Sequence, residues 1–463
     1  MSVGGGARRV PTMTLGLSVL VTVLSLPLIL RGDSTREIVL ATAVAVFAAY
    51  VAVIHPLSIF GALAAVLGFS PYAHLPGTEI PLILVLAVGL WVALMFVPGV
   101  ELRPGWCEWW VLALAAVALL SVVATGLSVA SSIELVAWVA ATAVVIPIRF
   151  LPTEARETTA RTFAVSTAVA SVVGMILLIA PSGVMARVLS FTGIDPQRPN
   201  VQQVAGSESI TTRLNGTYLE ANIAGLILAA GFLLALVYFD GRMRVALTVV
   251  IGSGLLLTLS RAALATVVVA VVLVALRAGG RRRLRLFWSG VTGAVVGLAI
   301  PGVRGRLLDS FGPTDTGTSA RWQALQDFPG VMDGHWIWGL GWDRPEFRDA
   351  ALNRATNLVA NAPLATVYRG GVILGALVVV VLLALVVRSW ANSRRSFADA
   401  VQCCSVIAFV AVALQLDHPV ANQPSATVMM SLLVGLSMHR DDRLVPQPRR
   451  SGSRPTATDT ARG

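Results

Sequence analysis

Apolar residues follow one another along this chain in long uninterrupted runs, each close to the length of a membrane-spanning helix. Most of the fourteen runs that can be marked contain roughly 15–20 residues, and about 20 apolar residues cross a bilayer core as an α-helix. They lie near residues 12–30, 38–54, 57–70, 80–97, 109–127, 133–150, 162–180, 221–239, 245–259, 262–276, 286–300, 372–387, 400–416 and 426–438. The pattern predicts an all-α, polytopic bundle of transmembrane helices.

The run 57–70 is shorter than the others and leaves the helix count open. Fourteen residues rise only about 21 Å as an α-helix, which is less than a full crossing of about 30 Å. His55-Pro56 ends the preceding run, because proline does not continue a helix. If runs 38–54 and 57–70 form a shallow hairpin the bundle has twelve helices, and otherwise fourteen. Either even number leaves both termini on one side.

Composition supports a membrane protein and excludes several other classes. The 463 residues are 56% hydrophobic and 13% charged, whereas a soluble protein carries about 25% charged residues. This excludes a soluble enzyme, a nucleic-acid binder and a disulfide-rich scaffold. The three cysteines show no spacing typical of a metal site or a disulfide framework.

The basic residues, all of them arginine, predict how the bundle is oriented. Cytoplasmic segments of membrane proteins carry the excess of positive charge. Arginines precede the first run without a following cleavage site, and the cluster at 277–285 falls on the same side by span count. We therefore expect a cytoplasmic N-terminal tail over 1–11, a membrane domain over 12–438 and a disordered cytoplasmic tail over 439–463. The outer face then receives two long loops, 181–220 and 301–371.

Some arginines nevertheless fall on the outer side, where the preference of positive charge for the cytoplasmic side does not explain them. They are Arg213, Arg261, Arg304, Arg306, Arg321 and Arg369. Arg261 is the one charge in the apolar stretch 245–276, which as a single helix would be about 48 Å long. The chain must therefore turn near Arg261, and an arginine in hydrocarbon costs about 3 kcal/mol or more. Its partner is a carboxylate or a ligand phosphate, unless the side chain snorkels to the interface.

Three stretches resemble the O-antigen ligase/polymerase family of lipid-linked glycan transferases. Residues 213–222 (RLNGTYLEAN) look like an element that precedes a membrane helix in that family. Residues 257–263 (LTLSRAA) look like its Ser-Arg turn. The third stretch runs from Arg321 through GLGW at 339–342 to YRGGVILG at 368–375, and is similar to the family's large outer loop.

This resemblance implies a polytopic fold with an outer-face cavity at the plasma membrane of a bacterium. It implies transfer of a glycan from a polyprenyl diphosphate to a glycan or lipid acceptor, without cofactor or metal and with membrane lipid but no nucleic acid as a partner. Carried over by residue, it assigns catalysis to Arg213, Arg261 and Arg321, donor diphosphate binding to Arg213, Arg261 and Arg369, and the acceptor side to Glu220, Asn222, Asn361 and His418.

One departure from the family concerns proton transfer. The family has His-Asn where this chain has Ala360-Asn361, so the expected histidine has no direct counterpart. Asn357 and His418 are the candidate substitutes. A phosphate leaving group needs charge stabilisation more than a general acid, so activity is compatible with the change.

Two other functions remain open at this stage. A transporter or flippase would place ionisable groups near the bilayer midplane and often has inverted repeats, whereas here the polar residues collect in the outer loops. A metal-dependent glycosyltransferase would need acids such as Asp33 and Glu37 on the short first outer loop. Within the resembling family, the residues do not separate a ligase from a polymerase.

Overall fold

The computed structural model describes a large part of the membrane domain. The described residues are 50–51, 53–75, 80–97, 105–180, 201–203, 212–218, 220–278, 280, 299, 304, 325–343, 348–349, 354–355, 361–414 and 424–438. The run 12–30, most of the runs 38–54 and 286–300, the predicted tails 1–11 and 439–463, and much of the predicted outer loops lie outside them. Within this part the chain is helical apart from two short strand pairs, which confirms the all-α prediction.

The helices follow the predicted apolar runs closely. They are α3 (Pro56–Phe69), α4 (Leu82–Phe96), α5 (Trp106–Thr125), α6 (Val129–Ala143), α7 (Val145–Arg149), α8 (Thr153–Ile179), α10 (Ala221–Tyr238), α11 (Gly241–Leu257), α12 (Arg261–Arg277), α16 (Ala362–Asn392), α17 (Phe397–Ala413) and α18 (Pro424–Ser437). Strand β1 (Val201–Gln203) pairs antiparallel with β2 (Thr212–Leu214), and β3 (Arg348–Asp349) pairs with β4 (Arg354–Ala355). The predicted break at His55 is confirmed, because α3 begins at Pro56.

Five of the described helical segments are long and apolar enough to cross a membrane. They are α5, α6 together with α7, α8, α10 and α16. Four of the shorter apolar helices, α3, α4, α17 and α18, complete the apolar bundle around them. The chain is therefore a multi-pass membrane protein.

Helix α10 lies at the centre of the bundle. It is apolar on all sides and contacts α3, α8, α11, α12, α17 and α18. Two of its glycines permit this close packing: a Cβ at Gly225 would lie 2.7 Å from the Cβ of Ala263, and one at Gly231 would lie 2.6 Å from Oγ1 of Thr167. The backbone of α10 therefore sits directly against α12 on one side and α8 on the other.

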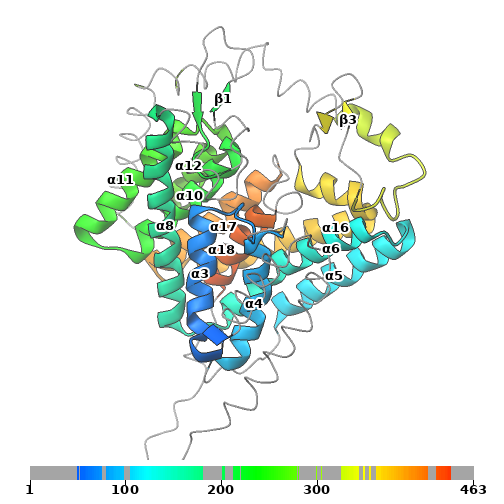
Figure 1. Cartoon of the computed structure of the whole chain (residues 1–463), viewed down its shortest axis with the longest axis horizontal. Helices are drawn as coiled ribbons and strands as arrows, with labels where there is room; N and C mark the ends of the chain where they lie inside the picture. Colours follow the sequence, from blue (N-terminus) through cyan, green and yellow to red (C-terminus); the bar gives the residue numbers. More distant parts are fainter. Residues whose placement is uncertain are drawn as a thin grey trace, which may run out of the picture.

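The bundle has two chemically different ends. At the first, here called the arginine-rich end, α12 and α16 finish side by side, since Arg277 donates to the carbonyl of Trp390 at 3.0 Å. Among the described residues, the arginines of this end are Arg149, Arg156, Arg161, Arg242, Arg244, Arg277, Arg388, Arg394 and Arg395. At the opposite end, the loop end, β1 and β3 lie at the top of Figure 1.

Helix α16 begins ten residues before the predicted span 372–387. Asn361 caps it, its side chain accepting from the backbone N–H of Leu364 at 3.1 Å. The helix is kinked at Gly371, whose φ is +83°, because the carbonyl of Ile337 occupies the space of a side chain there. Polar residues lie around this kink, so the search for uninterrupted apolar runs did not include the first part of α16.

The contact at Gly231 gives a stability prediction. Adding a methyl group there overpacks α10 against Thr167, which costs about 1–3 kcal/mol. Gly61 on α3 is the matched control, since nothing lies within 4 Å of its added Cβ and alanine favours helix by about 1 kcal/mol. We expect Gly231→Ala to lower the midpoint of thermal unfolding in detergent and Gly61→Ala to leave it equal or higher. An unchanged midpoint for Gly231→Ala contradicts the packing described.

Candidate functional site

A short hairpin segment at the loop end carries Arg213 into the bundle. Leu214 is fully buried and lies against Gly174 of α8, where a Cβ would be 3.0 Å from its side chain. Gly216 adopts φ +59°, which favours glycine, and turns the chain. The hydroxyls of Thr217 and Tyr218 then donate to the carbonyls that end α3, Tyr218 to Gly68 at 2.6 Å. The segment is thus fastened on both sides of its turn.

The guanidinium of Arg213 joins this segment to the break between α11 and α12. Its Nε donates to the backbone carbonyl of Thr258 at 2.9 Å, and its Nη2 donates to Oδ1 of Asn222 at 2.9 Å. Arg213 is 8% exposed. A planar group with several fixed donors can hold a carbonyl and an amide at once, so Arg213 clamps the turn to the start of α10.

The predicted break near Arg261 is confirmed and is a tight, self-capped turn. Helix α11 ends at Leu257, and Leu259 has φ +51°, a left-handed conformation rare for a residue with a branched side chain. The hydroxyl of Thr258 donates to the carbonyl of Leu255 at 2.7 Å. Ser260 then caps α12 by accepting from the N–H of Ala263 at 3.4 Å.

Asn222 connects the positive and negative groups of the site. Its Oδ1 accepts from Arg213 and from the hydroxyl of Ser260 at 3.3 Å, while its Nδ2 donates to Oε1 of Glu220 at 2.8 Å. This arrangement fixes the orientation of the amide, since only its oxygen faces donors. A chain of hydrogen bonds therefore runs from Arg213 through Asn222 to Glu220.

Arg261 is the first residue of α12 and stands on the turn that Arg213 holds. Its side chain is partly exposed. The N-terminus of a helix carries a partial positive charge, because its first N–H groups lack partners within the helix. Arg261 adds a full charge at the same point, so the start of α12 is the part of this cluster best suited to an anion.

Tyr72 belongs to the same neighbourhood, although the sequence reasoning did not include it. It follows α3, and its hydroxyl lies close to Ser425 at the start of α18 and within electrostatic range of Glu220. Burial raises the pKa of Tyr72 and the Glu220 carboxylate adds to the effect, so the phenol stays protonated. Tyr72 lies between two predicted apolar runs, and this position was the one sequence feature that could have pointed to it.

Arg369 lies on a second set of elements at the loop end. It is 7% exposed, and its guanidinium stands 5.8 Å from the ring centre of Trp342. Trp342 donates to the hydroxyl of Ser121 on α5 at 3.0 Å and packs on Trp138 of α6. Arg369 is therefore fixed among α5, α6 and α16, whereas the Arg213 cluster is built from β2, α10 and the turn before α12.

The remaining predicted residues divide between a structural role and positions outside the described part. The side chain of Asn361 caps α16 and donates to the carbonyl of Leu414 at the end of α17, at 2.8 Å. The residues outside the described part are Asp33, Glu37, Arg321, Asn357, Ala360 and His418. Among the described residues, no group of three or more His, Cys, Asp or Glu could hold a metal ion.

Comparison with known families places the Ser-Arg turn inside a recognised domain. Residues 246–363 match the family described as O-Antigen ligase. The matched range contains most of α11, the turn and α12, while the hairpin segment with Arg213 precedes it. No curated protein and no solved structure matches the chain. The match confirms the resemblance predicted from the motifs and supports a membrane ligase or polymerase that transfers glycans, in preference to a transporter.

The clamp at Thr258 gives a prediction that needs no substrate. Hydrogen bonds from a charged group contribute about 1.5–3 kcal/mol, so removing the guanidinium should increase local opening of the turn roughly 10- to 100-fold. We expect Arg213→Ala to speed amide hydrogen exchange over residues 257–264, measured by mass spectrometry on purified protein. Arg242→Ala, which removes an exposed arginine at the start of α11, is the control and should leave this exchange unchanged. Equal protection in wild type and Arg213→Ala refutes the clamp.

Proposed function

We propose that this chain, whose residues 246–363 match the O-antigen ligase family, transfers a glycan from a polyprenyl diphosphate to a glycan or lipid acceptor at the outer face of the bacterial plasma membrane. The observation that carries the proposal is the cluster at the start of α12. There a buried arginine holds a turn that presents a second arginine beside a helix N-terminus, with a carboxylate two hydrogen bonds away.

The donor diphosphate binds at the start of α12. A guanidinium matches phosphate oxygens with two parallel N–H donors and stays charged at any physiological pH. Arg261 makes this contact, and the N–H groups of the first turn of α12 add to it. Arg213 acts chiefly as a positioning residue, because its Nε and Nη2 already bind Thr258 and Asn222.

The reaction replaces one bond to the anomeric carbon by another. The acceptor hydroxyl oxygen bonds to that carbon, the bond from the carbon to the diphosphate oxygen breaks, and polyprenyl diphosphate leaves with the electron pair. Negative charge grows on the leaving diphosphate, where a preorganised arginine stabilises it most in the transition state. Arg261 supplies that charge, so the step requires no bound cation.

Glu220 accepts the proton of the acceptor hydroxyl in this proposal. It stands at the start of α10, partly exposed, and Asn222 fixes one of its oxygens. This gives the acceptor-side residues Glu220 and Asn222 separate roles, base and positioning group, and it removes the need for the histidine missing at Ala360. The catalytic role of Arg321, the donor-binding role of Arg369 and the acceptor-side roles of Asn361 and His418 remain predictions.

Replacing Arg261 by lysine tests the donor site. The ammonium keeps the charge but not the two-donor geometry, and losing one preorganised donor for a developing oxyanion costs about 10²–10³ in rate. We expect Arg261→Lys to lower kcat by about this factor with a smaller change in KM, in proteoliposomes supplied with a polyprenyl diphosphate-linked glycan.

The matched control is Arg244→Lys at the arginine-rich end, where Arg244 pairs with Asp240 on the same helix turn. It should retain wild-type turnover. Arg261→Lys with normal kcat and KM rules out the donor site at α12. Loss of activity in both variants would point to general damage, and the thermal midpoint of each protein separates that case.

A chelator tests whether arginine alone neutralises the leaving group. We expect the rate in excess EDTA to stay within about twofold of the untreated rate, because preorganised cations can replace a divalent ion in stabilising phosphate charge. Activity that EDTA abolishes and magnesium or manganese restores would favour a metal-dependent transferase. Asp33→Ala with Glu37→Ala would then be expected to abolish activity as well.

A further inference from the structure

A recess opens in the other half of the molecule, between α5, α6–α7, α16 and α18. It has a cavity volume of about 100 Å³, enough for part of an elongated ligand. Its walls include Trp106 and Trp110 from α5, Trp138 from α6, Val381 from α16 and Val434 from α18. It is separate from the Arg213 cluster, and the glycan transfer proposed above makes no use of it.

The lining of the recess suits hydrocarbon. The hydroxyl of Thr142 donates to the carbonyl of Trp138 at 2.8 Å, and that of Ser431 donates to the carbonyl of Thr142 at 3.2 Å. Both hydroxyls are thus bonded within the protein, and apart from Cys107 and Thr427 the other lining residues are apolar. A sugar or an ion would lose its own hydrogen bonds to water here without equal replacement.

The recess is open to the surroundings of the bundle. Trp106, Trp110 and Val381 line it and are each partly exposed, unlike the side chains of a sealed core. At the depth of membrane helices those surroundings are lipid chains. A ligand of this recess would therefore reach it from the bilayer.

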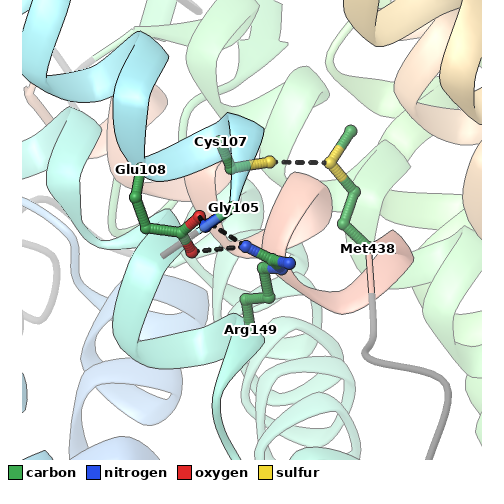
Figure 2. Close-up of polar contacts among 5 residues, drawn as sticks. All are labelled: Gly105, Cys107, Glu108, Arg149 and Met438. Atoms are coloured by element: carbon green, nitrogen blue, oxygen red, sulfur yellow. Dashed lines mark hydrogen bonds and ion pairs between the residues drawn. The ribbon is translucent and has the colours of Figure 1, made fainter. Parts of the chain in front are cut away.

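Charged groups collect where the recess reaches the arginine-rich end. The guanidinium of Arg388 stands 5.0 Å from the ring centre of Trp106, which is itself part of the wall. Arg149 binds Glu108 at 2.6 Å, and the N–H of Gly105 donates to the same carboxylate at 2.7 Å. Figure 2 shows this pair beside the thiol of Cys107, which also lines the recess and points at the sulfur of Met438.

The balance of these charges favours an anion. Arg149 and Arg388 both lie within electrostatic range of Cys107, as does the Glu108 carboxylate. Glu108 neutralises Arg149 by direct contact, so this group of two cations and one anion is left with one positive charge, on Arg388. That charge lies next to an amphipathic tryptophan, the arrangement found where membrane proteins meet lipid headgroups.

We propose that the recess binds one chain of an anionic glycerophospholipid from the leaflet at the arginine-rich end, with the lipid phosphate against Arg388. The apolar walls take part of the hydrocarbon chain, Trp106 beside Arg388 lies at the boundary between chain and headgroup, and one net cation meets one net anion. The bound lipid fills the space between α16 and α18 and so supports the packing of α5 and α6 on them.

Paired variants test the recess directly. Val381→Trp fills it from α16, whereas Val380→Trp, the neighbouring residue at 46% exposure, adds the same bulk outside it. Arg388→Gln removes the cation, and Arg394→Gln removes an exposed arginine at the same end. Full-length protein in detergent is stripped of lipid and titrated with phosphatidylglycerol or phosphatidylcholine, and bound lipid is counted by native mass spectrometry.

We expect wild type and Val380→Trp to bind one phosphatidylglycerol more tightly than phosphatidylcholine, and Val381→Trp to lose that binding event. Arg388→Gln should weaken phosphatidylglycerol about fivefold and remove the headgroup preference, since one arginine near an anionic lipid contributes about that factor, while Arg394→Gln should not. Equal binding by Val381→Trp and Val380→Trp overturns the proposal. So does a wild type without headgroup preference, or a copurified lipid that proves to be a polyprenyl phosphate.

Discussion

A chain buried in a bilayer has to satisfy every backbone polar group it exposes, because no water is present to do so. This constraint is most severe where a helix stops short. Between α11 and α12 the chain interrupts its own hydrogen bonding at Thr258, Leu259 and Ser260, all of them buried. Two of the repairs come from the turn itself, through the hydroxyls of Thr258 and Ser260. The third comes from Arg213, 45 residues earlier in the sequence. The position of Arg213 therefore matters for the loop end. The hairpin segment that carries Arg213 is held in place by its contacts with α3 and α8.

The sequence predicted the break itself but not what repairs it. An apolar stretch of 32 residues with one arginine cannot be a straight helix inside a bilayer, and that argument needs only length and charge. The residue that stabilises the turn could not be predicted in the same way. Nothing in the spacing of Arg213 and Thr258 indicates that the arginine side chain reaches the carbonyl of Thr258. The sequence therefore predicted Arg213 as a ligand-binding arginine equal to Arg261. The structure gives it backbone and amide partners, and the two arginines differ in burial.

The first residue of α16 is a second feature that apolar runs alone did not predict. Asn361, Pro363 and Arg369 make its first ten residues look like loop, although Asn361 caps the helix and a proline in the first turn is compatible with it. Only packing reveals the continuation: the segment 335–343 lies along this part of α16, and the N–H of Leu340 donates to the carbonyl of Tyr368 at 2.8 Å. Tyr72 and Ser425 were missed for a related reason, because their relation to Glu220 depends on three elements far apart in sequence.

The two close contacts of α10 also bear on how this molecule can move. Gly225 seats α10 against the start of α12, and Gly231 seats it against α8, each with less room than one methyl group. A helix interlocked at two points, with backbone against side chains, can neither slide nor rotate without separating from both neighbours. The wall of the bundle that carries Arg213, Asn222 and Arg261 is therefore a fixed surface against which a lipid-linked substrate can be oriented.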